Sequence, residues 1–331
     1  MRKQILAVGL PIVLVAVSLL HLTTGQAKIS PADVVDAVLH YDPTIYQHVV
    51  IVLQRITRLV VALYCGAALA VSGLLLQKVM QNILVSPSTL GISSGASTFA
   101  VLAILLFDMS GGALFWPALV GGLVAVGLAF FTASLLGPMD GSKLNLVLAG
   151  SMISILFSSM TAFIISLDPA AFDNLLSWLV GTIGNFDYLD LPLMVPLGLL
   201  SIVGAFILSR AIDLLLLGDE QAAVLGANVK LVYGATLGIA VILAVSAVVV
   251  VGPIGFVGLV VPHIAKILFG ETGRLPLWGC LFIGPIVLVT ADIGARTLAA
   301  PQMLNVGTIM GLIGGAAFLL IIMLGVKRAA L

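Results

Sequence analysis

Residues 231–251 read LVYGATLGIAVILAVSAVVVV and contain no charged side chain. A helix needs about 20 consecutive apolar residues to cross the hydrocarbon core of a bilayer. This run is therefore long enough to cross a membrane as one helix. The rest of the 331-residue chain has the same character, because 61% of its residues are hydrophobic and only 8% are charged. A soluble domain carries roughly 25% charged residues, so this chain is predicted to use lipid as its solvent.

Apolar runs of this kind recur along the chain and predict an all-α, polytopic membrane protein with about ten transmembrane helices in a single domain, residues 1–331. The predicted spans are 5–23, 59–79, 88–107, 112–136, 144–166, 190–212, 231–251, 255–269, 277–297 and 306–325. Segment 28–57 is more polar and predicts a short surface helix followed by a loop. Segments 168–188 and 213–230 are predicted to be polar connections.

The N-terminus has two readings. Arg2 and Lys3 precede an apolar run, and Gly25-Gln26-Ala27 resembles a cleavage site, as in a secretory signal peptide. The run with its flanks is also long enough to span a bilayer, and many spans follow it. We therefore favour a first transmembrane helix that is not cleaved.

The distribution of basic residues predicts the orientation, because cytoplasmic loops of membrane proteins are rich in lysine and arginine. With the N-terminus inside, ten of the 14 basic residues are cytoplasmic: Arg2, Lys3, Lys78, Lys143, Arg210, Lys230, Lys266, Arg274, Lys327 and Arg328. The four outside are Lys28, Arg55, Arg58 and Arg296. An even number of spans also places the C-terminus in the cytoplasm.

Several functional classes are disfavoured. No lysine follows a glycine, so the chain has no Walker A loop and would need another polypeptide to bind ATP. No catalytic constellation is evident, and the four histidines have no metal-ligand spacing, so neither an enzyme nor a metal site is predicted. Cys65 and Cys280 lie in apolar runs and do not predict a disulfide. The net charge is zero, which makes nucleic acid an unexpected partner.

Charged residues deep in the membrane would suggest a carrier driven by an ion gradient, and the predicted spans contain almost none. Lys78, Arg210 and Lys266 fall near inner ends, where long side chains can extend to the interface. Asp292 is the exception, and Arg296, four residues later on the same helix face, is predicted to pair with it. An ion-driven secondary carrier remains the alternative from another class.

Glycines four residues apart recur within the predicted spans. The pairs Gly91/Gly95 and Gly234/Gly238 and the series at 307, 311 and 315 place small residues on one helix face. Such faces let helix backbones approach closely in a membrane. We predict that these glycines pack against neighbouring helices.

Several segments, in one order along the chain, resemble the FecCD-like permeases, the transmembrane subunits for iron-siderophore, haem and vitamin B12 uptake. The clearest is Gly252-Pro253-Ile254-Gly255-Phe256-Val257-Gly258-Leu259-Val260-Val261-Pro262-His263-Ile264. Further matches are residues 66–73 leading to Gln77, residues 90–96, residues 217–226, residues 178–181 and Ala291-Asp292. The sequence departs from the family pattern in three places. Arg55-Ile56-Thr57-Arg58 and Asn82-Ile83-Leu84 each lack a proline that the family often has. Lys266 replaces an arginine that is common in the family.

The resemblance implies a type II ABC importer permease fold in a bacterial inner membrane. It implies a dimer, expected to be a homodimer, with two cytoplasmic ATPase subunits and a periplasmic or lipid-anchored substrate-binding protein. The chain itself is expected to bind no cofactor, because ATP and Mg²⁺ bind to the partner ATPase. The implied cargo is a bulky metal chelate. The run Ser86-Pro87-Ser88-Thr89-Leu90-Gly91 favours a ferric siderophore, with haem, cobalamin and molybdate as alternatives.

The connection 213–230 resembles the family's coupling helix, which docks on the ATPase. Asp219 is predicted to cap a short helix through its carboxylate, and Gly226 to end it in the left-handed conformation. An ordinary connector is the alternative reading. The residues assigned to the coupling helix are Gly218, Asp219, Glu220, Gln221, Ala222, Ala223, Val224, Leu225 and Gly226.

Two further sites are implied. The family docks its binding protein through outward arginines, which match carboxylates bidentately, and Arg55, Arg58 and Arg296 are the candidates here. Lipid contacts, or the Asp292 pair for Arg296, are the alternatives. Asn82 and Leu84 match family positions near a cytoplasmic gate, and Ser142 and Lys143 lie in a comparable inner loop, which could also be a simple connection.

Other readings stay open from the sequence. Glu220-Gln221-Ala222-Ala223 superficially resembles the Glu-Ala-Ala loop of importers with a shorter helical bundle, but ten spans and the Pro-His-Ile element argue against that architecture. A membrane receptor or assembly scaffold is the least favoured reading.

Overall fold

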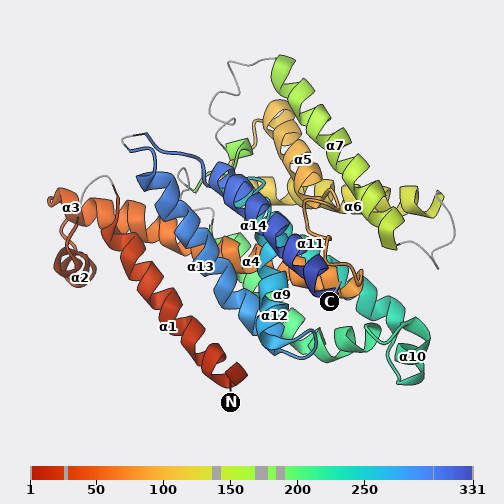
Figure 1. The fold of residues 1–331 in the computed structure, drawn as a ribbon. Helices are drawn as coiled ribbons and strands as arrows, with labels where there is room; N and C mark the ends of the chain where they lie inside the picture. The colour runs from red at the N-terminus through yellow and green to blue at the C-terminus, as the bar shows by residue number, and fades with distance from the viewer. Residues whose placement is uncertain are drawn as a thin grey trace.

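The computed structural model describes residues 2–25, 29–135, 143–167, 178–183, 191–300 and 302–329, and the regular secondary structure of these residues is helical (Figure 1). The α-helices are α1 (Arg2–Thr23), α2 (Pro31–Leu39), α3 (Tyr46–Val49), α4 (Thr57–Val79), α5 (Ile92–Phe107), α6 (Phe115–Leu135), α7 (Lys143–Leu167), α9 (Leu191–Leu215), α10 (Asp219–Val224), α11 (Val229–Val251), α12 (Val257–Phe269), α13 (Leu275–Thr297) and α14 (Val306–Ala329). The predicted connection 168–188 lies largely outside the described residues.

Each of the ten predicted spans corresponds to a helix of the structure, which confirms the all-α fold. Among the described residues, seven helical stretches are long and apolar enough to cross a membrane, and α5, α12 and α14 contribute shorter apolar helices. The limits of α12, the shortest of the predicted spans, are Val257–Phe269. Pro262 lies inside this helix, where the missing N–H removes one intrahelical hydrogen bond.

Helix α4 is the central element of the bundle. It runs through the middle of Figure 1 and packs against α9, α11, α12 and α13. Its most apolar stretch is 89% buried, against 6% for α1, which lies at the edge of the bundle. A helix enclosed on all sides needs small side chains where its neighbours cross it. The sequence supplies them between Gly66 and Gly73.

Two pairs of glycines set the closest crossings of α4. Gly66 meets Gly284 of α13, and Gly73 meets Gly258 of α12, so closely that a Cβ atom on either α4 glycine would strike the facing backbone. Gly95 makes the same kind of contact with Gly121, between α5 and α6. The prediction of glycine packing is therefore correct for Gly95 and wrong for Gly234 and Gly238, around which the structure leaves open space.

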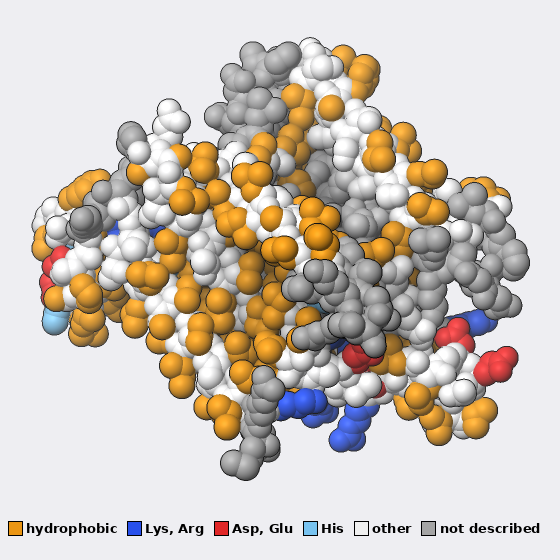
Figure 2. Space-filling view, viewed as in Figure 1, with side chains coloured by type: hydrophobic (Ala, Val, Ile, Leu, Met, Phe, Trp, Pro, Cys, Tyr) orange, Lys and Arg blue, Asp and Glu red, His pale blue; other side chains and the backbone are white. Residues whose placement is uncertain are grey.

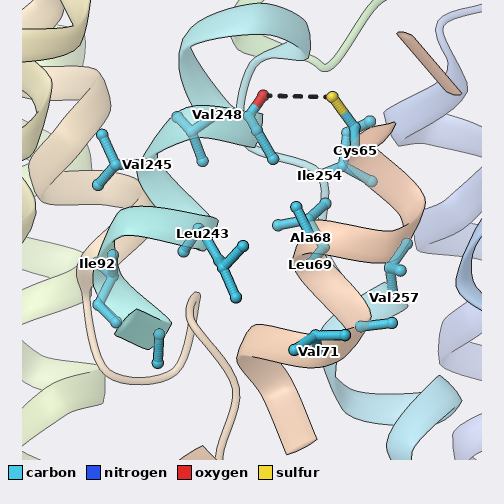
Figure 3. Close-up of a cluster of buried hydrophobic side chains, with 14 of the residues drawn as sticks. Cys65, Ala68, Leu69, Val71, Ile92, Leu243, Val245, Val248, Ile254 and Val257 are labelled. Atoms are coloured by element: carbon cyan, nitrogen blue, oxygen red, sulfur yellow. Dashed lines mark hydrogen bonds between the residues drawn. The ribbon is translucent and has the colours of Figure 1, made fainter. Parts of the chain in front are cut away.

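The core between α4 and α11 is mostly apolar, and two buried hydrogen bonds of 2.7 Å cross it, from Tyr64 to Ser246 and from Ser72 to the carbonyl of Ala240. Figure 3 shows side chains of α4 facing those of α11, with the α11–α12 turn beside them: Cys65, Ala68, Leu69, Val71, Leu243, Val245, Val248, Ile254 and Val257. The Cys65 thiol lies 4.0 Å from the carbonyl oxygen of Ala247. Both cysteines are fully buried and unpaired.

The segment before α4 differs from the prediction of a surface helix and a loop. Helix α2 is present, with Ser30 and Asp33 forming a reciprocal capping box. Beyond it, α3, a π-helical turn (Val50–Ile56) and α4 form one continuous helical stretch, Tyr46–Val79. The predicted loop is therefore present at residues 40–45, but it is shorter than predicted, because residues 46–57 are helical. The reason is local, since position 57 is a threonine that continues the helix and bonds its hydroxyl to the carbonyl of Leu53, at 2.7 Å.

Candidate functional sites

Helix α10 lies on the connection between α9 and α11, at the edge of the bundle in Figure 1, where it contacts both of these helices. Gly218, at its N-cap, has a φ of +103°, and no side chain caps the helix. The prediction that Asp219 caps it is wrong, because Asp219 is already its first helical residue. The prediction for Gly226 is confirmed. Its φ is +86°, and its N–H donates to Ala223 while Ala227 donates to Ala222, the pattern that closes a helix.

The two faces of α10 have different roles. Ala222 is fully buried and therefore packs inside this chain. Val224 and Leu225 are 87% and 59% exposed, so together they form an exposed apolar pair at the end of α10. Figure 2 shows charged side chains gathered around α10 and along the same edge of the molecule. The face that a partner could contact is thus formed by Val224 and Leu225, and Ala222 does not belong to it.

The outer arginines are engaged within the chain. Arg55 is 5% exposed and donates a hydrogen bond to the carbonyl of Leu22, at 2.6 Å. Arg296 is also 5% exposed, and its guanidinium donates to the carbonyls of His21 and Thr24. These carbonyls lie at the C-terminal end of α1, where the helix dipole favours positive charge. The structure thus brings two of the three candidate docking arginines to one helix end.

Asp292 binds the third arginine and organises the cluster. It is fully buried, accepts hydrogen bonds from Arg58 on both of its oxygens, at 2.8–3.0 Å, and forms an ion pair with Arg296, at 3.1 Å. The predicted Asp292–Arg296 pair is confirmed. The imidazole of His21, also fully buried, lies 2.8 Å from the same carboxylate. His21 and Arg58 come from α1 and α4, so the cluster joins three helices. Sequence reasoning missed both partners because they lie 271 and 234 positions away.

The candidate gate residues are described only in part. Asn82 and Leu84 follow α4, and the side-chain oxygen of Asn82 accepts the N–H of Leu84, at 2.9 Å, in a tight turn. Ser142 lies outside the described residues. Lys143 begins α7, but its side chain also lies outside them.

The two lysines at predicted inner ends differ in exposure. Lys78 is 2% exposed and forms an ion pair with Asp213, so the prediction that its side chain extends to the interface is wrong. Lys266 is half-buried and donates to the side chain of Gln77, at 2.8 Å. Arg210, by contrast, is exposed. Among the described residues, no group of three or more His, Cys, Asp or Glu side chains is placed to hold a metal ion.

The glycine-rich segment 252–264 forms the turn from α11 to α12 and the first two turns of α12. Gly252 has a φ of +76° and approaches the carbonyl of Trp178 so closely that no Cβ atom would fit. Phe256 adopts a φ of +66°, which is rare for a bulky residue. Its ring packs against Gly314 and Gly315 of α14. The glycines of this segment therefore serve close backbone contacts.

A helical bundle of this length and apolarity defines a multi-pass membrane protein. Comparison with known proteins agrees with this class. The sequence profile of the FecCD transport family matches residues 13–324. The chain belongs to the FecCD transport family, as the sequence resemblance indicated.

Individual relatives are similar over nearly their whole length. A Bacillus subtilis permease named for a siderophore transport system is 33% identical over 98% of this chain and 97% of the relative. The vitamin B12 import system permease of Vibrio vulnificus is 34% identical over 93% of this chain and 90% of the relative. A solved ABC transporter of the metal-chelate type, in an inward-facing conformation, superposes with a TM-score of 0.81 at 25% identity, covering 97% of this chain and 99% of that one.

Proposed function

We propose that this chain is the membrane-spanning subunit of an ATP-driven importer that carries a ferric siderophore into the cytoplasm. The observation that supports it best is α10, a short helix on the connection between α9 and α11 whose exposed side chains include Val224 and, just past its end, Leu225. A separate ATPase subunit would contact this face and supply the energy, with ATP and Mg²⁺ bound on that subunit. The chain itself provides the path through the membrane.

The cargo is proposed from the relatives and from the sequence. One close relative is named for siderophore transport, and residues 86–91 resemble siderophore permeases. The relative named for vitamin B12 makes cobalamin the second candidate. Haem and molybdate are further chelate or anion cargoes that the family resemblance allows.

The outer side would receive a substrate-binding protein through Arg55, Arg58 and Arg296. Because these arginines are bound to Asp292 and to the end of α1, docking would have to compete with contacts inside the chain. On the inner side, Asn82 and Leu84, with Ser142 and Lys143, are proposed to form the cytoplasmic gate. In this orientation both chain termini lie in the cytoplasm. The membrane is proposed to be the inner membrane of a bacterial cell.

Reconstitution tests the proposal. We expect liposomes that contain the permease and its ATPase subunit to accumulate a radiolabelled ferric hydroxamate only when MgATP reaches the ATPase and binding protein is supplied. Permease alone, with a proton or sodium gradient across the liposome, is the matched control and is expected to accumulate nothing. Accumulation driven by either gradient would replace this proposal by the secondary-carrier reading, and ATP-driven uptake of cyanocobalamin alone would replace the siderophore.

A further inference from the structure

The end of α4 lies between the two helices that flank α10. On the α9 side, the ammonium group of Lys78 contacts the carboxylate of Asp213 at 2.6 Å. On the α11 side, the hydroxyl of Tyr233 donates to the sulfur of Met80, at 3.1 Å. Asp213 lies six positions before the first residue of α10, and Tyr233 lies one turn into α11. The connection that carries α10 is therefore attached to α4 on both sides.

Asp213 joins a third element to this contact. Its second carboxylate oxygen accepts the N–H of Gly273, at 2.6 Å, in the turn between α12 and α13. The side-chain amide of Gln81 donates to the carbonyl of Leu215, at 2.5 Å. We call Lys78, Gln81 and Asp213 the α4–α9 clasp. It fixes the last turn of α9 immediately before the chain turns into α10.

The same end of α4 leads directly into the Asn82–Leu84 turn. Gln81 adopts a φ of +46°, a left-handed conformation that costs energy for a residue other than glycine. The N–H of Asn82 then returns to the carbonyl of Gln77, at 3.2 Å. Gln81 thus bonds to α9 through its side chain and sets the start of the turn through its backbone. A movement of α9 would reach the turn through Gln81 and through Lys78, which lies three positions earlier.

The burial of Lys78 makes the ion pair costly to break. Its side chain is 2% exposed and that of Asp213 is 18% exposed. Separating one partner of a buried ion pair leaves a buried charge without its counter-charge. The pair therefore resists movement of α9 relative to α4.

We propose that the α4–α9 clasp transmits displacement of α10 to the Asn82–Leu84 turn. This inference rests on the proposed function, in which an ATPase subunit acts on α10. Lys78, Gln81 and Asp213 are then positioning residues, because they act on the turn and touch neither ATP nor cargo. The clasp is a contiguous set of contacts between the two sites, from Asp219 at the start of α10 to Leu84 at the end of the turn.

The test uses the permease assembled with its ATPase subunit in lipid nanodiscs. A cysteine at Ile83, which is 45% exposed, carries an environment-sensitive fluorophore, and the fully buried Cys65 and Cys280 stay unlabelled. The double variant Lys78→Met, Asp213→Asn removes the ion pair without leaving a buried charge and keeps an acceptor for Gly273. Arg210→Met, an exposed cation one turn earlier on α9, is the matched control.

We expect MgATP to change the fluorescence of the parent and of the Arg210→Met control. In the double variant this change should fall at least fivefold, and uptake should fall with it, while copurification with the ATPase and basal ATP hydrolysis stay within twofold of the parent. Gln81→Gly relieves the strained φ and removes the bond to Leu215. It should keep the fold and lower the fluorescence response in the same direction, so the inference stays testable if the double variant does not fold.

The results separate this inference from the proposed function. An unchanged response and uptake in the double variant, or in Gln81→Gly, overturn the inference. A double variant that no longer copurifies with the ATPase also overturns it, because the clasp would then only hold α10 in place. A parent that binds the ATPase but shows no response at residue 83 contradicts the inference alone. A parent that binds no ATPase subunit contradicts the proposed function.

Discussion

Asp292 is fully buried, forms ion pairs with two guanidinium groups and contacts an imidazole. The contribution of its charge to the stability of the fold can be measured by substitution. Replacing it by asparagine leaves Arg58 and Arg296 without their anion. Removing one partner of a buried ion pair costs about 3 to 5 kcal/mol. We expect Asp292→Asn to lower the thermal unfolding midpoint of the purified permease clearly.

The matched control for that change is Asp108→Asn. Asp108 is exposed and has a φ of +51°, which asparagine adopts as readily as aspartate. The unfolding midpoint of this variant should equal that of the parent. Equal midpoints for both asparagine variants would mean that Asp292 does not hold the cluster together.

Two glycine-to-alanine changes test the helix crossings. A Cβ atom at Gly73 would strike the backbone of Gly258, so Gly73→Ala must separate α4 from α12 and should destabilise the fold by about 1 to 3 kcal/mol or more, as overpacking does. Gly234 has open space around it, and alanine there should be neutral or stabilise α11 by up to about 1 kcal/mol. Thermal unfolding of both variants measures the difference, and equal loss at both positions would contradict the crossing geometry.

Docking at the outer side is best tested at Arg55, the candidate arginine that does not contact Asp292 in the described ion pairs. We expect Arg55→Gln to weaken binding of the substrate-binding protein about tenfold at low salt, where charge pairs are least screened. Surface-immobilised permease in nanodiscs gives the affinity, and the unfolding midpoint shows whether the fold is kept. Unchanged affinity with an intact fold would remove Arg55 from the docking site.

At the scale of single elements, we propose that α10 contacts the ATPase subunit through Val224. Introducing a charge into an apolar contact should prevent docking, so we expect Val224→Glu to abolish copurification with the ATPase subunit. Val35→Glu is the matched control, because Val35 is 57% exposed on another short helix, α2. Normal copurification of Val224→Glu would show that α10 is not the contact.

The elements themselves were largely predictable, and the reason is physical. Bilayer thickness fixes the length of an apolar run, so the ten spans could be located from composition alone. The end of α10 was predictable because Gly226 takes a conformation that few other residues take. The π-helical turn before α4 was not, since its limits depend on how the helix packs and leave no periodic signal.

The candidate sites were less predictable than the helices because their contacts join distant parts of the chain. The Asp292–Arg296 pair follows from a spacing of four residues on one helix. Lys78 and Asp213 lie 135 positions apart, and nothing local in either segment indicates the other. Burial of Ala222 likewise depends on the packing of its neighbours, so the sequence could not show which side of α10 faces a partner.

For the whole molecule, we expect the purified importer to contain two identical copies of this chain. Most soluble and membrane oligomers are symmetric, and one symmetric pair presents α10 twice, once for each ATPase subunit. Native mass spectrometry of the complex released from detergent measures the composition. A complex with one copy of this chain and one different permease would show a heterodimer instead.

The enclosed position of α4 has a consequence for biosynthesis. The ribosome makes α4 early, but its partners α9 and α11–α13 follow much later. At about 5 to 20 residues per second, Asp213 emerges roughly 7 to 27 s after Lys78, given the 135 positions between them. During that interval a helix destined for the centre of the protein, with a lysine near its end, has only lipid or the insertion machinery around it. The cell must therefore shelter α4 until the later half of the chain arrives.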